Sequence, residues 1–284
     1  MKTLLTTETV RFREELKSQG YAQKQCHSAL LSSIRQLAAV WAAFCNQSLE
    51  HKLKLPYEKS RWYEYKDPAN DPTVFDYKEN FHLRRGMVLP SNFQATEIDK
   101  LLLQSGYDFL NEMRPLIQSV AFMLSDITGV DFVALTDDEQ RTVARLLHYF
   151  GKMKGAEWDN KDLAEAHPDK AGLTFAVYES LPGLRGFWNG TWQSVQAKPG
   201  HIVVFGGLLC QLYSKGIVKA FYHDVEKSPV NDAVGRFSVV NFRDFISDWV
   251  YDKDTFGSTQ KAFKGASNYT MSFEEFQARF KRVS

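Results

Sequence analysis

Residues 173–205 read LTFAVYESLPGLRGFWNGTWQSVQAKPGHIVVF and alternate β-prone runs with turn-forming residues. The turns fall at Pro182-Gly183, Asn189-Gly190 and Pro199-Gly200, and Gly206-Gly207 follows the quoted stretch. Short apolar and aromatic runs at this spacing are typical of antiparallel strands joined by tight turns. The expected strands are Leu173 to Tyr178, Trp192 to Val195, Ile202 to Phe205 and, further along, Phe237 to Phe242. The pattern predicts a β-barrel or jelly roll after about residue 143.

The first half of the chain shows the period of helices instead. From Ser28 to Cys45, apolar residues recur every three or four positions, as on the buried face of a helix. A second helical run follows Ala95, with its apolar face at Leu102, Leu110, Met113, Ile117, Val120 and Leu124. Thr136 and Glu139 match a capping box, so a third helix is expected to begin there. The first half is therefore predicted to be largely helical.

The segment from Pro56 to Pro90 interrupts the helical pattern. Its prolines stand among aromatic and charged residues, a mixture that favours a long surface loop. Loops of this length are often functional. The aromatic residues Trp62, Tyr63 and Tyr65 are candidates for the wall of a pocket, although aromatic side chains are more often part of a core.

Composition and charge exclude several classes of protein. The 284 residues include 35 Lys and Arg against 34 Asp and Glu, so the formal net charge is +1 and no basic surface for nucleic acid is expected. The hydrophobic content of 44% is enough for a sizeable core, which argues against disorder. No signal peptide is expected, because the apolar run from Met1 to Thr7 is too short, and no membrane span is expected, because the segment from Ala29 to Cys45 is interrupted by Arg35 and Gln36.

The cysteines indicate the redox compartment. Cys26, Cys45 and Cys210 are an odd number and lack the spacing of a disulfide framework or a zinc site. A reducing environment suits such residues. The sequence therefore predicts a cytoplasmic location.

His167-Pro168-Asp169 is the first part of a candidate metal site. In an extended segment, residues two apart leave the same face of the backbone, so His167 and Asp169 could reach one ion. His223 follows on another expected strand and could supply a third ligand. Two histidines and one carboxylate on one face of an ion are associated with iron(II) oxygenases. Taken singly, each histidine is equally compatible with a surface or core position.

Arg236-Phe237-Ser238 is a candidate anchor for an organic acid. Arg236 and Ser238 share one face of the strand expected there. A guanidinium offers a planar fork to a carboxylate, and a neighbouring hydroxyl adds one more donor. The alternative for Arg236 is a salt bridge at the edge of a strand.

Together, the order His167-x-Asp169, His223, Arg236-x-Ser238 resembles the isopenicillin N synthase-like branch of the 2-oxoglutarate- and iron(II)-dependent oxygenases. Gly172-Leu173-Thr174 looks like the residues that follow the family's first two ligands. Further similar positions are Gly183, Leu184, Gly190, Trp192, Val195, Pro199, Gly200, the stretch from Phe205 to Val225 and, upstream, Asp76 to Phe81. The resemblance is dense from about 143 to 242 and thinner elsewhere.

The chain also departs from the family pattern. Gly207 stands where the family usually has an aspartate, and Asp224 follows His223 where an arginine is common. The family's Asn-x-Tyr-Pro stretch is absent, and Leu147 to Phe150 occupies roughly its place, which puts a cosubstrate contact by Tyr149 in doubt. None of these changes removes a candidate ligand.

The resemblance implies a double-stranded β-helix, or jelly roll, buttressed by α-helices, so that the chain is mainly β with a helical N-terminal half. We expect residues 1–284 to form one oxygenase domain. Residues 1–142 would be mainly helical support and a substrate loop, 143–245 the jelly-roll catalytic core, and 246–284 a C-terminal extension.

The resemblance also implies the chemistry. His167, Asp169 and His223 would bind Fe(II), Arg236 and Ser238 would bind the cosubstrate 2-oxoglutarate, and O2 would oxidise an unactivated C–H bond, with release of succinate and CO2. Two alternatives stay open: an iron oxidase that does not use 2-oxoglutarate, and a non-catalytic jelly-roll binding module. The expected partner is a small molecule such as an amino acid, a short peptide or a natural-product precursor. Oligomeric state cannot be read from the sequence.

Other residues are weaker candidates for the site. His201 is an alternative ligand to His223, and His148 could point into the barrel or be a packed, hydrogen-bonded residue. Phe81, Arg85 and Trp188 are the candidate substrate-binding residues, with Phe81 and Trp188 as pocket walls and Arg85 as a partner for a carboxylate. Arg84 could take the role of Arg85, and the alternative for both is a solvated pair in the loop.

Overall fold

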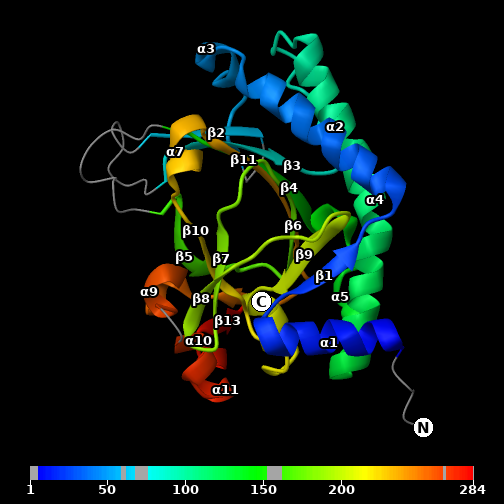
Figure 1. Cartoon of the computed structure of the whole chain (residues 1–284), viewed down its shortest axis with the longest axis vertical. Coiled ribbons are helices and arrows are strands. Elements are labelled where there is room, and N and C mark those ends of the chain that lie inside the picture. Colours follow the sequence, from blue (N-terminus) through cyan, green and yellow to red (C-terminus); the bar gives the residue numbers. More distant parts are fainter. Residues whose placement is uncertain (1–5, 59–61, 68–75, 152–161, 265–266, 284) are drawn as a thin grey trace.

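Two antiparallel sheets face each other at the centre of the molecule (Figure 1), in a computed structural model that describes residues 6–58, 62–67, 76–151, 162–264 and 267–283. The major sheet has seven strands in the order β1-β9-β6-β11-β4-β3-β2, and the minor sheet has four in the order β5-β10-β7-β8. Sequence neighbours are spread over both sheets, as in a jelly roll. The predicted double-stranded β-helix is confirmed.

The strands of the major sheet are β1 (Ala22–Gln25), β9 (His201–Gly206), β6 (Leu173–Glu179), β11 (Arg236–Arg243), β4 (Thr142–Tyr149), β3 (Lys78–Leu83) and β2 (Trp62–Lys66). Those of the minor sheet are β5 (Ala164–Pro168), β10 (Tyr222–Val225), β7 (Leu184–Trp188) and β8 (Thr191–Ser194). Asn189 and Gly190 join β7 to β8, and both have positive φ, 50° and 83°. Two such residues form the mirror-image turn that matches the twist of a hairpin.

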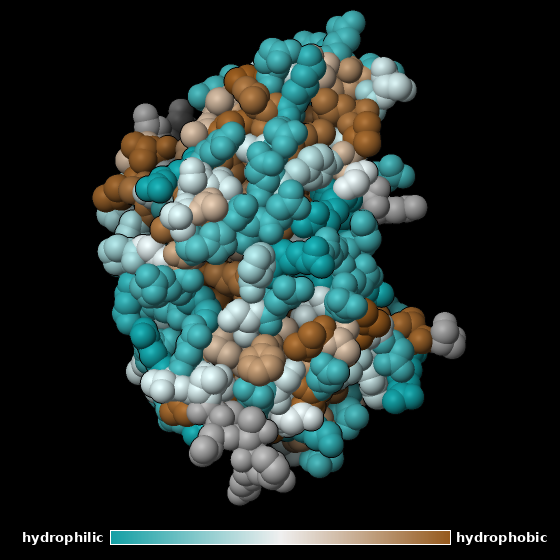
Figure 2. Space-filling view, turned by 90° about the vertical axis from the view of Figure 1, so that its right-hand side faces the viewer, coloured by the Kyte–Doolittle hydropathy of each residue, from teal (hydrophilic) through white to brown (hydrophobic). Residues whose placement is uncertain are grey.

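Helices cover the outer face of the major sheet. These are α1 (Thr7–Gln19), α2 (Ser28–Cys45) and α4 (Glu97–Thr128), which Figure 1 shows together on one side of the sheet. The α2 helix has the predicted bounds, and α4 contains the second predicted apolar face. Hydrophilic side chains cover most of the outer surface of this layer, and its apolar side chains form separate patches (Figure 2). The layer therefore buries one face against the sheet and exposes the other to solvent.

The α2 helix is long and apolar enough, by length and composition alone, to cross a membrane. In this structure it packs against α4, and its Trp41 Nε1 donates a hydrogen bond to the backbone oxygen of Leu147 in β4. Core helices of globular domains pass the same test of length and composition. The contacts of α2 are those of a core helix.

The long segment from Pro56 to Pro90 is not simply a loop. Within its described residues, β2 and β3 form an antiparallel hairpin that extends the major sheet through β4. Every residue of β3 is buried, so this strand is held by packing on both faces. The prolines had suggested a loop, but none of them lies inside either strand. Pro68 and Pro72 are outside the described residues.

The third predicted helix is also absent from the described structure. A short helix, α5 (Phe132–Leu135), ends before Thr136, and a single 3-10 turn, η1 (Glu139–Arg141), leads directly into β4. The Thr136 hydroxyl donates to the backbone oxygen of Phe132 and does not cap a new helix. Pairing of β4 with β11 begins at Thr142, which leaves no room for a helix. With β1, β2 and β3 in the sheet as well, residues 1–142 are more than helical support.

The C-terminal segment closes one end of the roll. Its strands β12 (Trp249–Tyr251) and β13 (Phe280–Arg282) pair with each other, and α9 (Thr259–Ala262) packs against β5. Phe245, Phe263 and Phe276 are fully buried and tie this segment to the core. The remaining helices are α3 (Leu49–Lys52), α6 (Leu208–Tyr213), α7 (Pro229–Val234), α8 (Lys253–Phe256), α10 (Ser267–Thr270) and α11 (Phe273–Gln277).

Candidate metal centre

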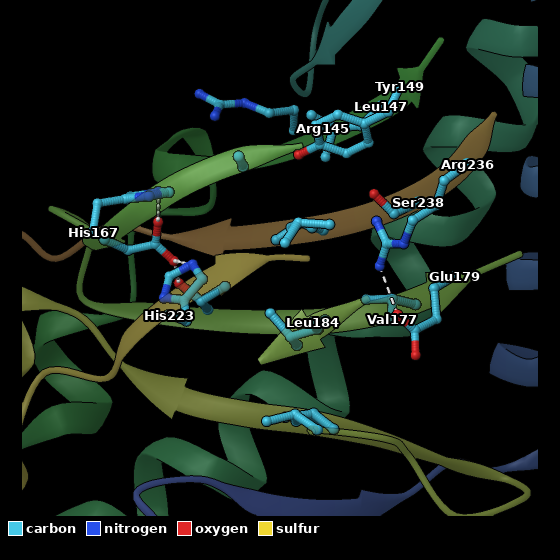
Figure 3. A pocket seen from close by; sticks show the side chains of 18 of the residues that line it. Arg145, Leu147, Tyr149, His167, Val177, Glu179, Leu184, His223, Arg236 and Ser238 are labelled. Atoms are coloured by element: carbon cyan, nitrogen blue, oxygen red, sulfur yellow. Dashed lines mark hydrogen bonds and ion pairs between the residues drawn. The ribbon is translucent and has the colours of Figure 1, made fainter. Parts of the chain in front are cut away.

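His167 and His223 face each other across two strands of the minor sheet. They are direct partners in the antiparallel pair of β5 and β10. Asp169 follows β5 immediately, and one ligand atom from each of the three residues lies within 4.8 Å of the others. The shortest carboxylate distances are 3.7 Å from His167 Nε2 and 3.8 Å from His223 Nε2. Figure 3 shows His167 and His223 at one end of a pocket, which Asp169 also lines.

In both imidazoles Nδ1 is hydrogen-bonded and Nε2 is left to bind a metal ion. His167 Nδ1 donates to the backbone oxygen of Glu165 at 2.6 Å, and His223 Nδ1 donates to that of Phe221 at 3.0 Å. A carbonyl can only accept, so the hydrogen is on Nδ1 and the lone pair is on Nε2, which faces Asp169. Burial and the neighbouring His223 lower the pKa of His167 to about 4, which keeps it neutral at pH 7. This is the protonation state that a metal ligand requires.

Asp169 is fixed by contacts on both its side chain and its backbone. The Thr174 hydroxyl donates to Asp169 Oδ2 at 2.6 Å, and the amide of Leu208 donates to the Asp169 backbone oxygen at 2.8 Å. Gly207 makes this approach possible, because a Cβ there would lie 2.1 Å from the backbone oxygen of Ala171. The departure from the family at residue 207 therefore has a steric reason. Two oriented imidazoles and an anchored carboxylate fit a divalent iron ion.

A cavity of about 290 Å³ extends from these three residues between the sheets. At the end away from His167 it is lined by Arg236, Ser238 and Tyr149 (Figure 3). Most of its wall is apolar and comes from Leu147, Ala176, Leu184, Val203, Phe205 and Val240. Arg236 and Ser238 share the same face of β11, as predicted. The cavity thus joins the candidate metal ligands to the candidate anchor.

Arg236 is buried, with 3% of the residue exposed, and is held in one orientation. Its Nε donates to the backbone oxygen of Leu181 at 2.9 Å, and its Nη2 pairs with Glu179 Oε2 at 2.6 Å. Within the described residues, Arg236 Nη1 and the Ser238 hydroxyl have no hydrogen-bond partner, so both can serve a carboxylate in the cavity. Glu179 is not among the residues predicted for the site. The expected strand from Leu173 to Tyr178 stopped one residue before it.

A larger open cleft, of about 990 Å³, adjoins the same site. His167 and Asp169 line both the cleft and the inner cavity, as do Arg145 and Phe242. A group bound at the three candidate ligands would therefore be reached from two sides. The inner cavity contains the candidate anchor for an organic acid, and the cleft leaves room for a second molecule.

The three candidate substrate-binding residues do not line either space. Phe81 is fully buried in the core against Phe44, and Trp188 packs on Phe221 and Tyr269. Arg85 pairs with Glu139 at 3.0 Å beside a different, small cavity. Phe81 is unavailable to a substrate because β3 is a fully buried strand of the major sheet and this side chain packs on Phe44 of α2. Of the loop aromatics, Trp62 and Tyr63 are likewise buried in the core.

The other histidine and arginine candidates also have different surroundings. His201 Nδ1 donates to the backbone oxygen of Pro199, and His201 does not line the cavity. His148 points away from the cavity and bonds to Glu79 at 2.8 Å, which is the packed arrangement. Arg84, by contrast, lines the open cleft. Tyr149 lines the inner cavity next to Arg236, although the family's surrounding residues are missing.

A second group with metal-ligand atoms, Cys45, Glu79 and His148, lies on the opposite face of the major sheet. The Glu79 carboxylate is already engaged by His148, by Lys52 at 2.6 Å and by Tyr63 at 2.7 Å. Burial raises the pKa of the Cys45 thiol above its ordinary value, which disfavours a thiolate ligand. The group is therefore a buried hydrogen-bond network. It links α2 and α3 to the sheet.

The aspartate after His223 is matched by an arginine on the next strand. Asp224 and Arg185 are partners across β10 and β7, and Arg185 binds both carboxylate oxygens at 3.0 and 2.7 Å. This bidentate pair fixes β10 directly beside His223. The unusual residue 224 is thus part of a cross-strand ion pair next to the candidate ligand.

The part of the chain that holds the candidate ligands is similar to known proteins. Residues 143–244 match the family model described as the 2OG-Fe(II) oxygenase superfamily. Leucoanthocyanidin dioxygenase of Malus domestica is 27% identical over 128 residues, which cover 43% of this chain and 34% of that protein. The chain thus spans about a third, or less, of the length of the first curated relatives that it matches.

Solved structures share the fold at low sequence identity. Neurospora crassa T7H, in complex with alpha-KG and 5-formyluracil, superimposes with a TM-score of 0.71 at 18% identity, over 96% of this chain and 86% of that chain. AtDAO1, the dioxygenase for auxin oxidation 1 from Arabidopsis thaliana, in complex with 2-oxoglutarate, gives a TM-score of 0.67 at 17% identity, over 84% and 88%.

Proposed function

This chain belongs to the 2-oxoglutarate- and iron(II)-dependent oxygenase superfamily, and we propose that it is a dioxygenase that oxidises a C–H bond of a small molecule. The observation that carries the proposal is the inner cavity, which has His167, Asp169 and His223 at one end and Arg236 with Ser238 at the other. In the proposed hydroxylation, one oxygen atom of O2 enters the substrate and the other enters succinate. Carbon dioxide leaves from the 2-oxo acid, so atoms and electrons balance.

Each residue has a defined task in this proposal. His167, Asp169 and His223 would hold Fe(II), which supplies the reaction with O2 when bound. The backbone carbonyls of Glu165 and Phe221 keep the imidazoles turned toward it, and Thr174 orients the carboxylate. With three protein ligands, a bound ion would keep coordination positions for 2-oxoglutarate and O2. A structural metal site, in which protein ligands fill every coordination position, would have no such room.

Arg236 and Ser238 would bind the distal carboxylate of 2-oxoglutarate. The guanidinium gives direction as well as charge, because Leu181 and Glu179 fix its orientation. The apolar side chains between the two ends of the cavity exclude water from the reacting groups, which limits side reactions. The open cleft would take the prime substrate.

An assay of the full chain tests the proposal. The protein is supplied with Fe(II), 2-oxoglutarate and a panel of amino acids, short peptides and natural-product precursors. Oxygen uptake and succinate release are measured together. We expect at least one compound to stimulate both. Oxygen uptake without succinate would instead indicate an iron oxidase that does not use 2-oxoglutarate. If protein that has bound iron shows neither oxygen uptake nor succinate release, a non-catalytic module is favoured.

We also propose a reducing, cytoplasmic location. All three cysteines are free, and Cys26 and Cys210 are buried. Burial raises the pKa of the Cys26 thiol to about 11, so it stays protonated and resists oxidation. Imaging of the tagged protein in its own cells would test this location.

A further inference from the structure

The open cleft beside the metal centre contains an unusual pair of side chains. His82 on β3 and Arg145 on β4 are cross-strand partners, so both leave the same face of the major sheet. Both line the cleft, together with His167 and Asp169. The cleft therefore connects this pair to the metal centre.

His82 is buried but has no polar partner. Only 1% of the residue is exposed, and neither ring nitrogen has a hydrogen bond in the described part of the chain. The edge of the Tyr57 ring covers it, with 5.3 Å between ring centres. Buried polar groups in proteins are nearly always paired. Because these nitrogen atoms have almost no exposed surface, the Tyr57 ring, which is 45% exposed, would have to move aside before a ligand in the cleft could reach them.

Arg145 has a charge without a counter-charge. Its Nε is buried without a partner, and it forms no ion pair with any described residue. The guanidinium lies 5.0 Å from the centre of the Phe242 ring, which supports its planar fork. In Figure 3 the side chain leaves β4 toward the side of the view that holds His167. The group is thus charged, and it lines both the open cleft and the inner cavity, as His167 and Asp169 do.

The charges around the cleft have one dominant sign. Its described lining includes two carboxylates, Asp169 and Asp244, and the cations are Lys66, Arg84, Arg141, Arg145, Lys170 and Lys253. Asp169 is itself a candidate metal ligand. Burial and the nearby cations, with Arg145 first among them, lower the pKa of His82 to about 2. The surroundings of His82 therefore favour a negative guest, and His82 remains neutral at pH 7.

We propose that the prime substrate is a small organic carboxylate that binds in the open cleft, with its carboxylate on Arg145 and His82. This inference rests on the proposed function and adds the substrate class. Arg145 supplies a planar fork that matches a carboxylate, and neutral His82 donates one further hydrogen bond. Phe242, Trp249 and Tyr251 line the same cleft and offer apolar surface for the rest of the molecule.

Binding to the full chain, loaded with Fe(II) and 2-oxoglutarate without oxygen, tests this substrate class. The probes are phenylacetate and hexanoate, each compared with its methyl ester and with phenethylamine or hexylamine. Calorimetry should show that the carboxylates bind about tenfold or more tightly than their esters and amines, because only they form the charge-assisted fork. Iron and 2-oxoglutarate binding are measured in the same samples, so a failure of the proposed function would be visible separately.

Substitutions of Arg145 and His82 test whether this pair causes the preference for carboxylates. Arg145→Leu should remove the preference for carboxylates, Arg145→Lys should restore part of it, and Arg145→Glu should shift it toward the amines. His82→Phe should weaken carboxylate binding several-fold while the preference stays. Arg141→Gln is the matched control, because Arg141 lines the same cleft but is paired with Asp138 at 3.2 Å. It should change carboxylate affinity by less than about twofold.

Four results would contradict a carboxylate substrate bound by Arg145 and His82. Equal binding of esters and acids, or no binding of either carboxylate to protein that binds iron and 2-oxoglutarate, would overturn it. So would an Arg141→Gln variant that loses as much affinity as Arg145→Leu, because the effect would then come from overall charge. Loss of 2-oxoglutarate affinity in Arg145→Leu, with carboxylate binding intact, would assign Arg145 to the cosubstrate instead.

Discussion

His167 and His223 are paired across β5 and β10, with 4.8 Å between their ring centres. Each ring is tied by Nδ1 to a backbone oxygen two residues earlier in the chain. The sheet therefore sets both the distance between the two Nε2 atoms and their direction. A metal ion would enter a site whose two nitrogen ligands are already oriented.

Loss of any one candidate ligand should nearly abolish iron binding. We expect wild-type protein to bind about one ferrous iron per chain, and His167→Ala, Asp169→Ala and His223→Ala to lose it, because two remaining ligands form a poor site. Anaerobic titration with ferrous iron measures this. His201→Ala is the matched control, since His201 bonds to Pro199 outside the cavity. Full iron affinity in His223→Ala, with loss in His201→Ala, would show that the assignment is wrong.

Arg236 should act on the cosubstrate and not on the metal. Arg236→Leu should keep iron binding but weaken 2-oxoglutarate by about 2–5 kcal/mol, the scale for truncating one partner of a buried charge pair. Arg236→Lys should recover only part, because lysine lacks the fork. Titration of the iron-loaded protein with 2-oxoglutarate gives its affinity for the cosubstrate. A separate anaerobic titration with ferrous iron gives its affinity for the metal. An unchanged affinity in the leucine variant would favour the oxidase that does not use 2-oxoglutarate.

Glu179 is expected to be a positioning residue for Arg236. It holds Nη2 at 2.6 Å and leaves Nη1 for the cosubstrate. Glu179→Gln should keep a weaker hydrogen bond and raise the KM for 2-oxoglutarate about three- to tenfold with little change in kcat. Glu179→Ala should raise it further. A fall in kcat at unchanged KM would contradict a positioning role.

The chemistry of the site could be predicted from the sequence because it depends on local spacing. His167 and Asp169 are two residues apart, as are Arg236 and Ser238, and a strand places residues at this separation on one face. Their meeting across the fold was inferred from family resemblance. The register that pairs His167 with His223 depends on the whole minor sheet, and no short pattern shows it.

The substrate side could not be predicted in the same way. Prolines and charges between Pro56 and Pro90 suggested a loop, and Arg85 was chosen from that loop. The segment instead adds β2 and β3 to the sheet, where His82 and Arg145 become neighbours although 63 positions separate them in sequence, 145 − 82. The buried network of Glu79 likewise joins residues from α2, α3, β2, β3 and β4. Such contacts follow from tertiary pairing, which overrides local composition.

Glu79 should stabilise the fold through its charge. Burial disfavours the carboxylate, but hydrogen bonds from His148, Lys52 and Tyr63 outweigh it and lower the pKa of Glu79 below its ordinary 4.5. This stability is present above the unfolded-state pKa and is lost as the pH falls through the lower folded-state pKa. Glu79→Gln should thus cost about 3–5 kcal/mol at pH 7, since the buried Lys52 loses its counter-charge, and clearly less in strong acid.

Urea unfolding of wild type and variant at both pH values measures the difference. Glu97→Gln is the control, because the Glu97 side chain is 81% exposed and pairs only with Lys100 on the surface. It should change the free energy of unfolding by less than about 1 kcal/mol. A cost for Glu79→Gln that does not vary with pH would mean that the hydrogen-bond geometry of residue 79 matters and its charge does not.

Gly207 is expected to be needed for the metal site more than for the fold. A Cβ at residue 207 would lie 2.1 Å from the backbone oxygen of Ala171 and 2.8 Å from that of Asp169, so Gly207→Ala must push the segment from Asp169 to Ala171 outward. The hydrogen bond from Leu208 to Asp169 would stretch, and the carboxylate would leave its place between the imidazoles. We expect iron affinity to fall about 10–100-fold, the scale for losing support of a metal ligand.

The control for Gly207→Ala is Gly190→Ala in the hairpin turn. Gly190 has a φ of 83° and nothing within 4 Å of a Cβ, so alanine there strains the backbone without touching the site. This variant should lose about 1 kcal/mol of stability and keep its iron affinity. Gly207→Ala should instead lose iron affinity, and this loss should be larger than its decrease in thermal stability can explain. If both variants lost stability equally and neither lost iron affinity, contact between residue 207 and the Asp169 segment would not govern the metal site.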